Sequence, residues 1–140
     1  MKYLTRFLML TLTLLPMLAA AQIEGDNKLR AQVPFDFVIG SRSVPAGQLT
    51  VATAAPGSNV LAMRNREGKV NLFAGAIRVE AKSPATTSAL VFHQYGHHYF
   101  LWEVKVEGSR ALYQLPQSKA EAELRAQNVQ APEEILLALK

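Results

Sequence analysis

Residues 89–106, ALVFHQYGHHYFLWEVKV, decide the fold class of this chain. Two runs rich in apolar and aromatic side chains, 89–94 and 99–106, lie on either side of Gly96. Runs of this length around a glycine-containing turn are typical of an antiparallel β-hairpin. The sequence therefore predicts a sheet whose centre carries five of the nine aromatic residues that follow residue 21.

Shorter strand-like runs recur on both sides of this hairpin. The run at 33–39 alternates apolar and polar residues, and Pro34 places one end at a sheet edge or a strand start because proline cannot donate to a ladder. Gly75 within 70–79 indicates a bulge or a close backbone approach. The remaining runs are 48–54, 60–64 and 110–115, separated by turn-forming residues at 40–47, 56–59, 65–68 and 82–87. This spacing predicts a mainly β fold, an antiparallel β-sandwich or small β-barrel of about 6–8 strands.

After the last of these runs, the apolar residues no longer follow the two-residue alternation of a strand. Ser118-Lys119-Ala120-Glu121 is a capping box. In this motif the Ser118 hydroxyl oxygen accepts a hydrogen bond from the Glu121 backbone amide, and the Glu121 carboxylate accepts one from the Ser118 backbone amide. Good helix formers follow, so we expect one short C-terminal α-helix over 119–127, packed on the sheet through Ala120 and Leu124. Residues 132–140 fit either a last helical turn or a strand.

The N-terminal residues predict export. Lys2 and Arg6 precede an apolar run at 7–18, and Ala19-Ala20-Ala21 offers a small-residue cleavage site, so 1–21 reads as a signal peptide. We expect a flexible leader at 22–31 and a single β domain at 32–140, exported and either periplasmic or extracellular. The mature chain has no apolar run long enough for a transmembrane segment.

The amino-acid composition excludes several classes of function. The chain has no cysteine, which excludes thiolate chemistry and cysteine-based zinc sites. Loss of Lys2 and Arg6 with the signal peptide lowers the net charge from +4 to +2, and the other basic residues are scattered along the sequence. No dense basic run is present, so no nucleic-acid partner is predicted.

The three histidines, His93, His97 and His98, fall within six residues and are the metal candidates. His97 and His98 are adjacent, so they should point to opposite faces of a strand, and the turn supplies no acidic ligand. A solvated hairpin tip is the alternative interpretation, and it is favoured over a metal site.

No sequence motif marks a nucleophile or a phosphate-binding loop. There is no G-x-S-x-G elbow and no S-x-x-K box. Asp36 and Glu103 are the two carboxylates that could pair for acid–base work, although single exposed carboxylates are far more common on a sheet. The sequence therefore predicts no catalytic residue and no cofactor.

The aromatic hairpin suggests a contact surface. If Phe100, Trp102 and Val104 face the core with Phe92, the opposite face carries a mixture of aromatic and polar side chains. Such a mixture is typical of a partner interface, of an ordinary sheet surface or of the underside of a helix. The possible contact residues are Tyr95, Tyr99, Leu101 and Glu103, with His93 and Lys105 on the same face.

Three segments together resemble an uncharacterised family of small, secreted bacterial β proteins of the acidobacterial type. The resemblance covers nearly all of the chain after the signal peptide, although Leu49 stands where such proteins often have an aromatic residue. It implies a secreted β domain and no known activity, ligand or catalytic residue. The segments are VPFDFVIG at 33–40 leading to VPAGQLTV at 44–51, LVFHQYG at 90–96 with YFL at 99–101, and LPQSKAEAEL at 115–124.

These features favour a non-catalytic exported envelope protein that acts as a binding or structural module. Its partner would be another envelope protein, met through the face of Tyr95, Tyr99 and Leu101. A carrier of a small apolar ligand or lipid in a barrel interior is the alternative, and it requires an apolar cavity of about 300 Å³ or more. A metal-binding protein or small hydrolase that uses the histidines is a third hypothesis.

Overall fold

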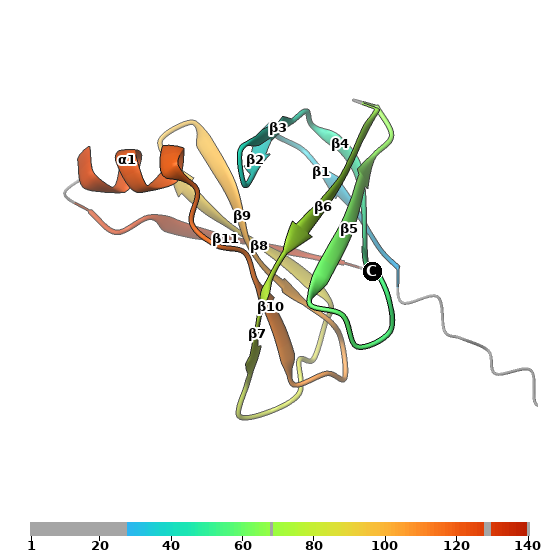
Figure 1. The fold of residues 1–140 in the computed structure, drawn as a ribbon. Helices are drawn as coiled ribbons and strands as arrows, with labels where there is room; N and C mark the ends of the chain where they lie inside the picture. The colour runs from blue at the N-terminus through green and yellow to red at the C-terminus, as the bar shows by residue number, and fades with distance from the viewer. Residues whose placement is uncertain (1–27, 68, 128–129, 140) are drawn as a thin grey trace, which may run out of the picture.

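The computed structural model describes residues 28–67, 69–127 and 130–139, so the predicted signal peptide and the expected turn glycine Gly68 lie outside the described residues. The described chain is a two-sheet β-sandwich with one short helix (Figure 1). The mainly β fold is confirmed, and it is a sandwich rather than a closed barrel. The elements are β1 (Leu29–Val33), β2 (Phe37–Ile39), β3 (Arg42–Val44), β4 (Gly47–Thr53), β5 (Val60–Asn65), β6 (Val70–Gly75), β7 (Ile77–Glu80), β8 (Ala89–Tyr95), β9 (His98–Lys105), β10 (Ala111–Gln114), α1 (Lys119–Gln127) and β11 (Glu133–Ala138).

The first sheet, which we call sheet A, has the order β1-β4-β5-β6 and is antiparallel throughout. One face of it is apolar and packs on the second sheet. The opposite face is mostly exposed and carries polar and charged side chains together with the exposed apolar side chains of Val60 and Phe73. The residues buried on the inner face are Ala31, Val33, Leu49, Val51, Leu61, Met63 and Leu72.

The second sheet, sheet B, has the order β11-β8-β9-β10-β7. The predicted hairpin is its centre, formed by β8 and β9 around Gly96, whose φ of 61° is the left-handed conformation that glycine adopts without strain. The small β2–β3 hairpin joins the same sheet through a parallel contact between Val38 and Phe100.

Two segments predicted as single strands are each divided between the sheets. The 33–39 run ends β1 at Val33 in sheet A and resumes at Phe37 in sheet B, with Pro34 in the crossing. The 70–79 run breaks after Gly75, so that β6 is the last strand of sheet A and β7 the last strand of sheet B. These two breaks add two strands, and β3 and β11 add two more, so eleven strands are present in the described residues rather than about 6–8.

Two further boundaries differ from the sequence analysis, and one open alternative is decided. Residues 29–31 belong to β1 rather than to a leader, because they pair with β4 and bury Ala31. The connection expected at 40–47 contains β3, which pairs with β2. The undecided end of the chain forms β11, which pairs with β8 along its whole length, while α1 has the predicted bounds.

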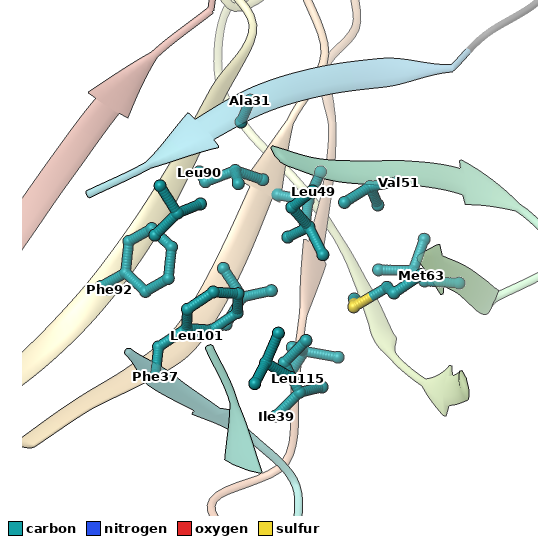
Figure 2. Close-up of a cluster of buried hydrophobic side chains, with 14 of the residues drawn as sticks. Ala31, Phe37, Ile39, Leu49, Val51, Met63, Leu90, Phe92, Leu101 and Leu115 are labelled. Atoms are coloured by element: carbon teal, nitrogen blue, oxygen red, sulfur yellow. The ribbon is translucent and has the colours of Figure 1, made fainter. Parts of the chain in front are cut away.

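The core fills the space between the sheets. Figure 2 shows Leu49, Met63, Phe92 and Leu101 pointing toward one another from both sheets. Phe35, in the crossing between β1 and β2, stacks on Tyr99 with ring centroids 3.9 Å apart and meets Phe92 edge-on at 5.0 Å. These contacts place Tyr99 and Leu101 on the core side of β9.

A β-bulge reverses the faces predicted for β9. Leu90 pairs with Val104, yet Phe92 pairs with Leu101, so the register shifts and Trp102 is the extra residue. An extra residue in one strand moves the side chains beyond it to the other face. Val104 and Phe92 therefore face the core as predicted, whereas Phe100 and Trp102 face away from it.

Candidate functional site

The structure separates the three histidines. His93 lies in β8 opposite Phe100 and is buried, whereas His97 and His98 are exposed at the β8–β9 turn. No group of three or more histidine, aspartate or glutamate side chains that could hold a metal ion occurs in the part of the chain that the structure describes. The described geometry thus gives the histidines no shared site.

His93 instead meets a carboxylate from the helix. Ser118 caps α1 as predicted, with the Glu121 amide donating to Ser118 Oγ at 3.1 Å. The Glu121 carboxylate turns toward the sheet, where it is 4% exposed and its Oε1 lies 2.7 Å from His93 Nδ1. Glu121 is also the buried residue of the helix, whereas Ala120 is exposed and Leu124 only half-buried, so the expected apolar stripe is replaced by a carboxylate.

Two aromatic side chains complete this cluster on the outer face of sheet B. Tyr95 donates its hydroxyl hydrogen to Glu121 Oε1 at 3.1 Å, and Trp102 stacks on the His93 ring at 4.8 Å. Burial raises the pKa of the Tyr95 hydroxyl above its ordinary value of 10.0, and the nearby Glu121 carboxylate raises it further. The cluster of His93, Tyr95, Trp102 and Glu121, which we call the helix latch, fastens α1 to the sheet.

The helix latch contains only part of a catalytic arrangement. A carboxylate that orients an imidazole is the supporting half of a nucleophile–base–carboxylate triad. The other ring nitrogen, His93 Nε2, lies 3.9 Å from the exposed carboxylate of Glu134 in β11. No serine, threonine or lysine contact with His93 occurs among the described residues, so the geometry supports docking of the helix better than nucleophilic chemistry.

The predicted contact surface is not formed. Tyr95 and Glu103 lie on the outer face of sheet B, whereas Tyr99 and Leu101 lie on the core side. Tyr95, Leu101 and Glu103 are all buried, each at 6% exposure or less. The β-bulge at Trp102 explains the division, since it reverses the alternation between the two pairs.

The two candidate acid–base carboxylates have separate partners. Asp36 lies in the crossing after β1, where its Oδ1 accepts the Ala46 amide at 2.8 Å. Glu103 accepts the Gln114 side-chain amide at 2.8 Å, and Lys105 Nζ lies 3.4 Å from it. Both carboxylates therefore stabilise local structure, and the structure does not bring them together.

A basic hollow lies on the outer face of sheet A. Its volume is about 700 Å³, and its lining comes from β1, β4, β5, β6 and the β5–β6 turn. The strand register explains why these side chains gather: Arg30, Thr50, Arg64 and Asn71 are successive cross-strand partners in one row. The full lining is Arg30, Gln48, Thr50, Arg64, Asn65, Arg66, Lys69, Val70 and Asn71, and we call it the basic hollow.

The positive charge of the basic hollow is not neutralised locally. The side chains of Arg30, Arg64, Arg66 and Lys69 make no hydrogen bond or ion pair with the described residues. No carboxylate lines the hollow. Glu67, in the adjoining turn, accepts the backbone amide of Gln48 at 2.9 Å instead. The hollow is therefore a concentrated cationic surface in a chain of low net charge.

Sequence reasoning missed the basic hollow because its cations are far apart along the chain. Arg30 and Arg64 are separated by 34 positions and meet only through β4, which pairs with both of their strands. One signal was present: in β5, exposed Arg64 alternates with buried Met63 and Asn65. The other arginine of the row, Arg30, lies in the segment 29–31, which the sequence analysis assigned to a flexible leader.

A second, apolar hollow lies at one end of the sandwich, with a volume of about 320 Å³. Sheet A contributes Leu29, Val51 and Leu61 to it, and sheet B contributes Val104 and Tyr113. Its place between the sheets gives it largely apolar walls.

Comparisons with family models, with curated proteins and with solved structures gave no match to this chain. Within the described residues, no helix has the length and the apolar character needed to cross a membrane. Function is therefore inferred from the geometry of the basic hollow, the helix latch and the apolar hollow.

Proposed function

We propose that this protein is a non-catalytic binding module that holds an anionic partner in the basic hollow of sheet A. The observation that carries the proposal is the group of four cationic side chains, free of ion pairs with described residues, around one hollow that no carboxylate lines. Like charges held close together repel one another, and a bound anion relieves that repulsion.

The helix latch supports the non-catalytic part of the proposal. His93 and Glu121 are buried beneath α1, and each is used to hold the helix on the sheet. A general base has to reach a substrate proton within hydrogen-bond distance. With one nitrogen against Glu121 and the other facing Glu134, His93 is better placed to hold structure than to meet a substrate.

The proposed setting is the bacterial envelope, periplasmic or extracellular, because residues 1–21 have the order of a signal peptide. Expression of the full chain in a bacterial host, followed by fractionation and N-terminal sequencing, tests it. We expect the exported form to begin at Gln22. Retention of residues 1–21 on a cytoplasmic protein would overturn this part of the proposal.

A titration with a small polyanion tests the binding surface. Sodium pyrophosphate, added at low ionic strength and followed by amide chemical shifts, should move signals in β1, β4, β5 and the β5–β6 turn. The double variant R30Q/R64Q should lose these shifts. The matched control R42Q/R78Q removes the same charge from exposed positions outside the hollow and should keep them. Shifts spread evenly over the molecule, or none at all, would contradict the proposal.

A second candidate function, binding of a small apolar ligand, is favoured by the apolar hollow. Its volume of about 320 Å³ is at the lower end of the range of ligand pockets. The sandwich has no closed barrel interior, so such a ligand would be held in a hollow of this kind, which lies between the edges of the two sheets. Native mass spectrometry of protein isolated from its own envelope tests the idea. Added mass of a lipid or metabolite would support it, and the bare chain mass would count against it.

A further inference from the structure

We propose that the ligand of the basic hollow is an acidic polysaccharide, a sugar chain that carries carboxylate or sulfate groups. This inference rests on the proposed function and adds to it the chemical class of the partner. Three features of the outer face of sheet A support it: the placement of the cations, the neutral polar side chains between them, and the length of the surface.

The cations are placed to hold more than one acidic group. Arg30 and Arg64 flank Thr50 from the two neighbouring strands, so they stand two strand spacings, or about 10 Å, apart. Arg66 and Lys69 lie beyond them at the β5–β6 turn. Guanidinium groups bind two oxygens of a carboxylate or sulfate group through paired hydrogen bonds, which makes them the preferred cations for such ligands. The arrangement fits a ligand whose acidic groups repeat along its length.

Neutral hydrogen-bonding side chains lie between the cations. The cross-strand row runs Arg30, Thr50, Arg64, Asn71, so that a hydroxyl and an amide alternate with the guanidinium groups. Gln48 adds a second amide beside Thr50. Amides and hydroxyls donate and accept, as sugar hydroxyls do. A ligand that is only a string of anions would leave these groups unused.

The surface is longer than one sugar unit. A neighbouring hollow of about 310 Å³ on the same face, distinct from the apolar hollow, continues from the basic hollow and shares Arg30, Thr50, Arg64 and Asn71 with it. It extends over Ala52 in β4 and Ala62 in β5, which directly face each other across the two strands. Successive outward-facing residues of a strand are about 6.7 Å apart, so this extension accommodates a ligand that runs along the strands.

The observations favour a sugar polymer over a nucleic acid or a membrane. Proteins that bind single-stranded nucleic acids stack successive bases on several aromatic side chains, whereas no aromatic residue lines either hollow and Phe73, the exposed partner of Ala62 in β6, is the one aromatic side chain on this face among the described residues. Attachment to a membrane surface uses apolar side chains that enter the lipid boundary, and the walls here are mostly polar or charged.

Calorimetric titrations of the mature protein compare four probes at one ionic strength: an oligogalacturonate, a heparin oligosaccharide, a maltooligosaccharide of matched length and an oligodeoxythymidylate of matched charge. We expect one of the two acidic glycans to bind roughly tenfold more tightly than both controls, and to weaken as salt is added. Equal or tighter binding of the oligodeoxythymidylate would overturn the inference, as would failure of both acidic glycans. Pyrophosphate shifts in the hollow would still support the proposed function in either case.

Two sets of variants locate the site and its specificity. R30Q/R64Q should weaken acidic-glycan binding by roughly tenfold or more, while R42Q/R78Q should not. T50V/N71A removes the hydroxyl and amide but leaves every cation, so it should weaken the glycan several-fold and leave the pyrophosphate shifts in place. An unchanged glycan affinity in a folded T50V/N71A protein, checked by its amide spectrum, would show that only charge is recognised and would refute the sugar class.

Discussion

At the scale of single residues, Glu121 connects the local and the tertiary structure. The capping box predicted that its carboxylate would return to the cap amide of Ser118. The structure keeps the Ser118 half of the motif, while the carboxylate accepts the Tyr95 hydroxyl and contacts His93. A buried carboxylate requires such partners, because moving a charged group out of water without hydrogen-bond partners costs several kcal/mol. The local motif starts the helix, and the tertiary contacts fix where the helix docks.

Replacing Glu121 should destabilise the protein through the groups it leaves behind. Glu121→Ala deprives His93 and Tyr95 of their shared acceptor, and we expect a loss of about 2–4 kcal/mol in the free energy of unfolding. Glu121→Gln keeps an acceptor oxygen and should cost less. Denaturant unfolding measures both, with exposed Glu123→Ala in the same helix as the control. A loss no larger than that of the control would mean that the helix latch contributes nothing.

Tyr95 should make the protein sensitive to alkali. Burial and the Glu121 carboxylate raise its pKa in the folded state above the ordinary value of 10.0, so the folded state holds this proton more tightly than the unfolded state. Stability is therefore unaffected below pH 10 and falls as the pH rises above it. Tyr95→Phe should reduce the slope of unfolding free energy against pH in that range. Parallel curves for the two proteins would contradict the assignment.

At the scale of elements, the bulge in β9 decides which aromatic side chains form the core. Strict alternation predicted Phe100 and Trp102 inside, and one extra residue reverses both. The sequence offers no glycine at this point to signal the irregularity. Pairing with β8 imposes it, because Leu90 and Phe92 both have to face the core. Register is thus a property of two strands, and one strand read alone does not reveal it.

A comparison of Leu101 with Trp102 tests the bulge directly. Leu101→Ala removes a buried side chain from the core and should cost about 2–5 kcal/mol. Trp102 is half-buried and stacks on His93, so Trp102→Ala should cost only about 1–2 kcal/mol. The midpoints of denaturant unfolding give both losses, provided that the unfolding free energy depends equally on denaturant concentration in the two variants. If Trp102→Ala is less stable than Leu101→Ala, Trp102 faces the core and the side chains of β9 alternate without a bulge.

Some elements of the fold can be predicted from residues that lie close together in the sequence, and others cannot. The hairpin around Gly96 and the helix 119–127 were predicted because each has a signal within a few residues: a turn glycine and a capping serine. The crossings at Pro34 and after Gly75 were predicted only as irregularities. Their true role, a change of sheet, depends on partners far along the chain. The basic hollow was missed for the same reason, since its cations meet only through strand pairing.

At the scale of the whole molecule, the outer faces of the two sheets differ in what covers them. The outer face of sheet A leaves its cations open, whereas the outer face of sheet B is partly covered by α1 and buries His93 and Glu121. The helix therefore occupies the surface where sequence analysis placed a contact region. This asymmetry directs the search for a partner to sheet A.

The shared core should make the two sheets unfold as one unit. Leu49 of sheet A and Phe92 of sheet B belong to the same buried cluster, and the chain crosses between the sheets at several points, among them 34–36, 45–46 and Ala76. Leu49→Ala should cost about 2–5 kcal/mol and lower the hydrogen-exchange protection of β4 and β8 amides by the same amount. Leu136→Ala, at a 57% exposed position of β11, serves as the control and should change neither. If β8 amides keep their protection while β4 amides lose theirs, sheet A opens separately, and the basic hollow would then be carried by a less stable unit than the helix latch.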